Sequence, residues 1–136
     1  MSITVNVSKT YTNQDIVDIF TTAIEGGINY WCSRYDVPKN MDIESFITDE
    51  DREEANGDLL YVEKVGFALA NGGKVKFLVD ENNDGSETKW YTLTISKLKR
   101  GIGLYTKIGS ANPEDWDATS SDCIIQYALF GELVFS

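Results

Sequence analysis

The stretch Glu25-Gly26-Gly27-Ile28-Asn29-Tyr30-Trp31-Cys32 marks the sharpest change of pattern in the sequence. Before it, apolar residues recur with helical spacing from residue 13 to residue 24, which is typical of an amphipathic helix. After it, residues 28–35 are rich in isoleucine, tyrosine and tryptophan, which favour a strand. Because glycine takes the left-handed conformation that ends many helices, we expect the helix to end at Gly26 or Gly27 and a strand to follow at once.

The aromatic strand expected at residues 28–35 leaves two interpretations of its rings open. Alternation along a strand places Tyr30 and Cys32 on one face and Trp31 and Ser33 on the other. In the first interpretation both rings pack in the core, since aromatic side chains supply much of any core. In the second, a ring forms a stacking platform at the mouth of a pocket.

The remaining chain predicts further helices and strands. Strands are expected at residues 2–8, 74–80 and 87–95, with an edge strand at 132–136, and helices at residues 59–71, 97–108 and 121–130. Thr12 or Asn13 is expected to cap the first helix, and Gly131 to end the last one. Residues 81–85 have the composition of a turn that joins two strands as a hairpin. Residues 36–58 predict a long acidic excursion with one helical turn near 42–54.

Length and composition indicate the fold class. The chain has 136 residues, of which 42% are hydrophobic and 12% aromatic, as in a globular protein of one domain. We therefore expect an α+β fold for residues 1–136: a single compact domain with an antiparallel or mixed sheet of about 4–5 strands and 3–4 helices. No apolar run is long enough for a membrane helix, and residues 1–7 lack a signal-peptide pattern, so we expect an intracellular protein without membrane contact.

Charge restricts the classes of partner. The formal net charge is -10, which repels polyphosphate and argues against direct nucleic-acid binding. The charge is unevenly spread, because residues 36–58 are strongly acidic whereas residues 96–109 contain only bases among their charged positions. Within a Debye length of about 10 Å, a small anion would respond to such a local basic patch more than to the total charge.

The sequence contains little catalytic chemistry. It has no histidine, which removes the commonest general base and most transition-metal sites. Cys32 and Cys123 have no activating partner in the sequence, and we expect two unpaired thiols. Residues 80–85 match the first half of a calcium loop, but Tyr91 occupies the position of its final glutamate, so a plain turn is expected. We expect a protein that is not an enzyme and that has no cofactor or metal.

Two segments carry a resemblance to a known family. The first is Asp18-Ile19-Phe20-Thr21-Thr22-Ala23-Ile24-Glu25-Gly26-Gly27-Ile28-Asn29-Tyr30-Trp31-Cys32, and the second runs from Trp116-Asp117 through Asp122-Cys123-Ile124-Ile125-Gln126-Tyr127-Ala128-Leu129-Phe130-Gly131-Glu132. Between them, Tyr91-Thr92-Leu93-Thr94, Lys97-Leu98 and Gly101-Ile102 also match. Together they resemble small accessory proteins of bacteriophages and prophages. The resemblance implies action in the cytoplasm of an infected host bacterium, where small non-enzymatic proteins neutralise host defence. It carries over no catalytic residue.

Two mechanisms of inhibition fit this resemblance. In the first, the protein sequesters a small anionic nucleotide signal, as sponge proteins do, usually as a homo-oligomer with pockets at subunit contacts. Its ligand-binding residues would be rings that stack on a base and cations that hold phosphate. The candidate rings are Tyr30, Trp31, Tyr35 and Trp90, and the candidate cations are Arg34, Lys97, Lys99 and Arg100.

In the second mechanism, the acidic surface imitates DNA and covers a groove on a host nuclease or another host defence protein. The protein-binding footprint would be Asp49, Glu50, Asp51, Glu53 and Glu54. The clustered bases have no use in a mimic, which favours the sponge, whereas the total charge favours the mimic. A structural or virion accessory role is a third alternative.

Overall fold

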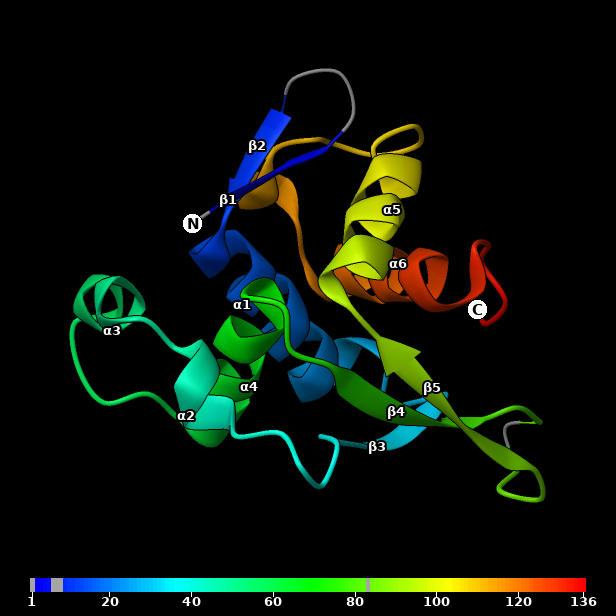
Figure 1. Ribbon diagram of the computed structural model, residues 1–136. Coiled ribbons are helices and arrows are strands. Elements are labelled where there is room, and N and C mark those ends of the chain that lie inside the picture. Colours follow the sequence, from blue (N-terminus) through cyan, green and yellow to red (C-terminus); the bar gives the residue numbers. More distant parts are fainter. Residues whose placement is uncertain (1, 6–8, 83) are drawn as a thin grey trace.

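The computed structural model describes residues 2–5, 9–82 and 84–136 and confirms the α+β fold class (Figure 1). In the described chain, six α-helices accompany one sheet of two strands and one of three, both antiparallel. The expectation of 3–4 helices was too low, because the acidic segment forms two short helices. The strands divide between two sheets because β1 (Ser2–Val5) pairs with β2 (Lys9–Thr12) instead of joining the larger sheet. Residues 6–8 of the strand expected at 2–8 lie outside the described residues.

The first long helix begins as predicted but ends differently. Thr12 caps α1 (Asn13–Thr22) through a capping box with Asp15. The helix continues into η1 (Ala23–Gly27), a single π-helical turn, and neither glycine takes a left-handed conformation. Gly27 is needed for another reason, since a Cβ there would lie 2.9 Å from the backbone oxygen of Ala118. The expected left-handed end is therefore wrong, and the glycine permits close packing against a later helix.

The larger sheet follows this corner. β3 (Cys32–Asp36) starts later than expected, because residues 28–31 form a turn. β4 (Val75–Asp80) and β5 (Thr88–Leu93) form the predicted hairpin, and the strand order is β3-β4-β5. Asp80 also donates its backbone N–H to the carbonyl of Trp31 at 2.8 Å, which ties the turn to the sheet.

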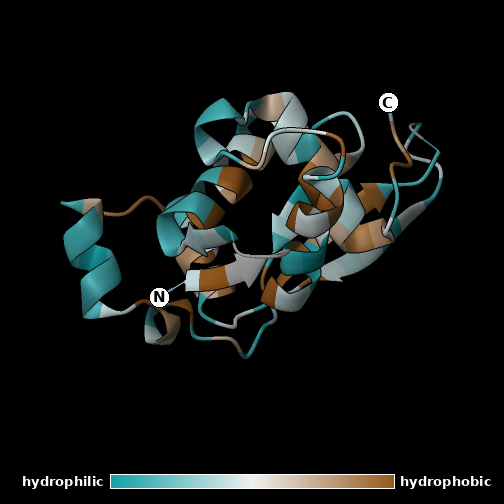
Figure 2. Ribbon diagram, turned by 90° about the horizontal axis from the view of Figure 1, so that it is seen from above, coloured by the Kyte–Doolittle hydropathy of each residue, from teal (hydrophilic) through white to brown (hydrophobic). Residues whose placement is uncertain are grey.

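The acidic segment forms α2 (Ile43–Phe46) and α3 (Asp49–Ala55) before the expected helix α4 (Tyr61–Ala70). α4 packs along α1, with Gly66 facing the backbone of Val17. Figure 1 shows α3 at the left edge of the molecule, away from the larger sheet. In Figure 2 the same helix is almost entirely hydrophilic.

The last two helices pack closely across each other. α5 (Ile95–Tyr105) is capped by Thr94 rather than Ser96, and a Cβ on its Gly101 would lie 2.4 Å from the Ile124 oxygen. After the short 3₁₀ turn η2 (Pro113–Asp115), Asp117 caps α6 (Ala118–Phe130), earlier than expected. Gly131 ends α6 in a left-handed conformation with φ 78°, as predicted. The main core forms between these helices, α1, α4 and one face of the larger sheet.

Candidate functional site

The larger sheet has one face toward the core and one toward the outside. Along β4, Val75, Phe77 and Val79 are buried, whereas Lys76 and Leu78 between them are half-buried. Because side chains alternate along a strand, the second set lies on the outer face. In the register of the sheet, this outer face includes Arg34 of β3, Lys76 and Leu78 of β4, and Trp90 of β5.

Trp90 lies on this outer face, on the edge strand β5. The strand register aligns Arg34, Leu78 and Trp90 in one row across the sheet. The guanidinium carbon of Arg34 lies 5.3 Å from the centroid of the Trp90 ring, and the ammonium nitrogen of Lys76 lies 5.1 Å from it. Trp90 is 38% exposed. We call Arg34, Lys76 and Trp90 together the Trp90 face.

The Trp90 face combines two kinds of recognition chemistry. An exposed indole offers a flat surface on which a base can stack, and a guanidinium and an ammonium group bind phosphate or carboxylate. Arg34 and Trp90 are both among the residues predicted from the sequence, and the fold brings them together. Lys76 was missed, although its place between the apolar Val75 and Phe77 indicated the outward face of a strand.

The aromatic turn before β3 has a different environment. Trp31 is 0% exposed, and its Nε1–H donates to Asp122 Oδ1 at 2.7 Å. Tyr30 is 45% exposed, and its hydroxyl donates to Asp122 Oδ2 at 2.5 Å. Asp122 lies on α6 and is itself buried. A ring with no exposed surface cannot stack on a ligand, so Trp31 is a core residue and is removed from the ligand-binding set.

The last residues of the chain cover Trp31. The Phe135 ring stacks on the Trp31 ring, with 5.3 Å between centroids and 3° between planes. The side-chain oxygen of Gln126 accepts hydrogen bonds from the backbone N–H groups of Val134 and Phe135, both at 2.8 Å, and its amide donates to the Phe135 carbonyl at 3.1 Å. The edge strand expected at 132–136 is therefore wrong, because a side chain from α6 takes the place of a neighbouring strand.

Burial changes the acidity of this corner. Burial, together with the hydrogen bond to Asp122, raises the pKa of the Tyr30 hydroxyl well above its ordinary value. Burial likewise raises the pKa of the Cys32 thiol to about 11. Burial, followed by the charges of Asp122 and Asp117, raises the pKa of Cys123. Both cysteines are free thiols, and neither has the lowered pKa of a reactive nucleophile.

The other predicted ligand-binding residues lie elsewhere. Tyr35 points to the opposite side of β3 from Arg34 and packs edge-on against Phe20, with ring centroids 5.3 Å apart. The three remaining cations lie on α5: Lys97 donates to the Thr92 carbonyl at 2.7 Å, Arg100 donates to the Ala128 carbonyl at 2.5 Å, and Lys99 is exposed. Lys97 and Arg100 thus support the packing of α5 against its neighbours. Of the eight candidate ligand-binding residues, Trp90 and Arg34 are thus the ring and the cation for which a direct contact is found among the described residues.

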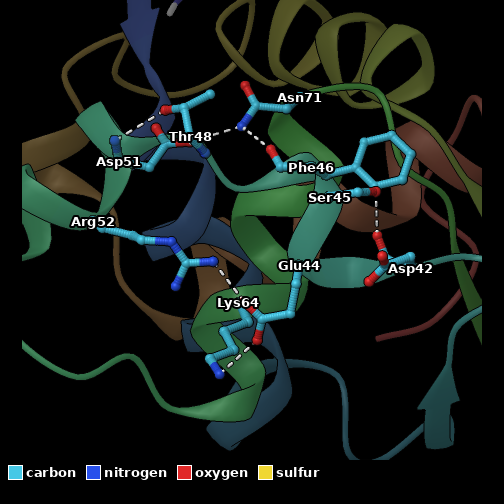
Figure 3. Close-up of polar contacts among 9 residues, drawn as sticks. All are labelled: Asp42, Glu44, Ser45, Phe46, Thr48, Asp51, Arg52, Lys64 and Asn71. Atoms are coloured by element: carbon cyan, nitrogen blue, oxygen red, sulfur yellow. Dashed lines mark hydrogen bonds and ion pairs between the residues drawn. The ribbon is translucent and has the colours of Figure 1, made fainter.

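The predicted acidic footprint divides into one buried residue and several exposed ones. Asp51 is 2% exposed and accepts hydrogen bonds from the side chains of Asn13 at 3.0 Å and Asn71 at 2.8 Å. Burial opposes its charge, but the hydrogen bonds from Asn13, Thr48 and Asn71 outweigh that effect and lower the pKa of Asp51. Figure 3 shows Asn71 between Asp51 and the backbone of Phe46. Asp51 therefore fixes α3 to the body and is removed from the footprint.

The exposed acids of α3 are Asp49, Glu50, Glu53 and Glu54. Its one base, Arg52, pairs with Glu44, which also binds Lys64 at 2.8 Å (Figure 3). The hydrogen bond from Lys64, and then that from Arg52, lower the pKa of Glu44. Because Arg52 and Lys64 are paired with Glu44, they do not neutralise the four exposed carboxylates of α3, which face solvent.

Among residues 2–5, 9–82 and 84–136, no three or more His, Cys, Asp or Glu side chains are grouped so that they could hold a metal ion. None of the described helices is long and apolar enough to cross a membrane. Comparison with known proteins finds no matching family model, no similar curated protein and no similar solved structure.

Proposed function

We propose that the protein is a non-enzymatic binding protein that sequesters a small nucleotide-derived signal on the Trp90 face. The observation that carries the proposal is the exposed Trp90 ring with Arg34 at 5.3 Å and Lys76 at 5.1 Å. Arg34 and Lys76 lie over the ring, so a base that stacks on the indole would displace these two side chains from it and leave them near the phosphate of the ligand. The resemblance to phage accessory proteins supports a role in the host bacterial cytoplasm, against a signal of host defence.

The magnitudes favour a small ligand over a polynucleotide. Stacking of a base on an aromatic side chain contributes about 1–3 kcal/mol, and charge-assisted hydrogen bonds to phosphate add to it. These contacts act over a few ångströms, whereas the net charge of -10 repels a long polyanion over its whole length. A ligand with one or two phosphates gains the local contacts and loses little to the long-range repulsion.

The proposal includes self-association. One Trp90 face covers only one side of a base, and sequestration needs a slow release of the ligand. A second copy that places its own Trp90 face over the ligand would enclose the base from both sides and supply two more cations. We therefore propose a homo-oligomer in which pockets form between subunits.

The test is a titration of the pure protein with cyclic dinucleotides and cyclic ADP-ribose, followed by melting temperature and tryptophan fluorescence. A ligand that binds the folded state raises the melting temperature by mass action. Trp90→Ala and Lys76→Ala should each abolish or strongly reduce the shift, while Lys99→Ala, an exposed base on α5, should leave it unchanged. No shift with any probe, or an equal shift in Trp90→Ala, would overturn the proposal.

A second candidate function rests on α3. Its exposed carboxylates lie on a short helix at one end of the molecule, where Asp51 holds the helix in place (Figures 1 and 3). We propose as the alternative that α3 occupies a basic groove on a host defence protein. Capture of a host protein that is lost in a variant with Asp49, Glu50, Glu53 and Glu54 changed to Gln or Asn, and retained in Trp90→Ala, would favour this alternative over the sponge.

A further inference from the structure

A cavity of about 710 Å³ lies between η1, one face of α6 and the end of the chain. α6 contributes Thr119, Asp122, Cys123 and Gln126, whose spacing places them on one side of the helix. Gly26 of η1 also lines the cavity. The volume falls within the range of about 300–1,000 Å³ that is usual for small-molecule sites. The Trp90 face contributes no residue to this cavity, so any site here is separate from the one proposed above.

The polar floor of the cavity is a buried, ordered cluster. Asp122 is 8% exposed and receives hydrogen bonds from Tyr30, Trp31 and Gln126. These three donors therefore point at the carboxylate and not into the cavity. A carboxylate has about four lone-pair sites, and the Asp122 carboxylate accepts three hydrogen bonds in this cluster. Asp122 can therefore accept one more hydrogen bond from a ligand.

The residues that line the cavity disfavour an anionic ligand and favour a cationic one. Among the described residues that line the cavity, none is basic, and Asp122 is the one acid. Leu133, Phe135 and the ring of Tyr30 supply apolar surface on the other sides. An anion would meet an uncompensated carboxylate, whereas a cation would meet a buried opposite charge and an aromatic ring. The negative charge of the whole chain acts in the same direction.

We propose that this cavity binds a small organic cation with an apolar body, of the arylalkylamine class. The ammonium group donates to Asp122 at the floor, and the apolar body packs between Tyr30, Leu133 and Phe135. This inference does not depend on the nucleotide site, because the two sites share no residue and select opposite charges.

The rate at which Cys123 is chemically labelled can report whether a ligand occupies the cavity. Cys123 lines the cavity, whereas Cys32 lies outside it and is buried with a pKa of about 11. A maleimide should therefore label Cys123 much faster than Cys32 near neutral pH, and a ligand in the cavity should slow that labelling. Peptide mass spectrometry assigns the label to one cysteine or the other.

The experiment compares two probes that share the indole ring: tryptamine, which is a cation, and indole-3-propionate, which is an anion. Tryptamine at about ten times its dissociation constant should slow Cys123 labelling about tenfold by mass action, and indole-3-propionate should not slow it. Equal protection by both probes, or no protection by tryptamine at millimolar concentration, would overturn the proposal.

Two variants and one control locate the effect. Gly26→Leu should abolish protection, because a Cβ at Gly26 has no neighbour within 4 Å and its backbone is not left-handed, so the fold can accept a side chain that narrows the cavity. Asp122→Asn should weaken tryptamine binding by about tenfold through the loss of the charge. Trp90→Ala should leave protection unchanged. Protection that persists in Gly26→Leu, with the fold verified by circular dichroism, would place the probe elsewhere and contradict the inference.

Discussion

Trp31 and Trp90 are both connected to the larger sheet, yet their surroundings are opposite. Trp31 is sealed by Phe130 and Phe135 and hydrogen-bonded to a buried carboxylate. Trp90 is partly exposed and has two cations over its ring. The same residue type therefore supports stability at one position, whereas at the other it lies at the centre of the binding face that we propose. The difference arises because Trp31 lies in the turn before β3, where the end of the chain and α6 pack against it, whereas Trp90 lies on the outer face of β5.

The largest expected effect is on stability at the sealed tryptophan. Trp31→Ala should lower the free energy of unfolding by about 3–5 kcal/mol, because it leaves a large cavity and removes one of the three hydrogen bonds to the buried Asp122 carboxylate. Trp90→Ala should lower it by less, about 1–2 kcal/mol, since a partly exposed ring loses its cation–π contacts and only part of its packing surface. Urea denaturation of the two variants measures both. Equal losses would show that the two rings do not differ as described.

The next effect concerns the carboxylate that holds the sealed corner. Asp122→Ala should cost about 2–3 kcal/mol, because Trp31 Nε1, the Tyr30 hydroxyl and the Gln126 amide lose their common acceptor. The matched control is Asp49→Ala, which removes an exposed acid of α3 and should change stability by about 0.5 kcal/mol or less. A neutral result for Asp122→Ala in urea denaturation would mean that the cluster does not stabilise the corner.

A smaller effect on stability is expected at alkaline pH and comes from the Tyr30 hydroxyl. The folded-state pKa of Tyr30 is raised above the unfolded value of about 10, so the folded protein holds this proton more tightly than the unfolded chain. Its contribution to stability is therefore complete below pH 10 and is lost as the pH rises above that value. The urea midpoint should fall between pH 9 and pH 11 more steeply in the wild type than in Tyr30→Phe. Parallel curves would contradict the raised pKa.

The smallest expected effect on stability is at the open face. Lys76→Ala should change the free energy of unfolding by about 0.5–1 kcal/mol or less, the range of an exposed cation–π contact. It should also alter the fluorescence of Trp90, because a charge 5.1 Å from the ring is removed. Lys99→Ala serves as the control of equal charge. A large loss of stability in Lys76→Ala would show that the face is part of the core.

Local patterns in the sequence predicted much of the fold. The capped helix α1, the hairpin of β4 and β5, helix α4 and the glycine end of α6 all depend on residues that are close together in the chain. The sequence placed Arg34 and Trp90 in the same set of candidate ligand-binding residues, but it did not predict their contact. Its geometry needed the register across three strands, which spans more than fifty residues of sequence.

Short-range periodicity and turn chemistry by themselves determined that this chain forms an α+β protein with a strand whose two faces differ. Only the tertiary structure decided that Trp31 is sealed, that Asp51 and Asp122 are buried, and that the end of the chain lies over the aromatic corner. The physical reason is that burial depends on contacts between distant segments: Trp31 meets Asp122 across 91 residues, and Asn13 meets Asp51 across 38. The hydropathy of a residue indicates its preference for burial, but the packing of distant elements determines whether that preference is met.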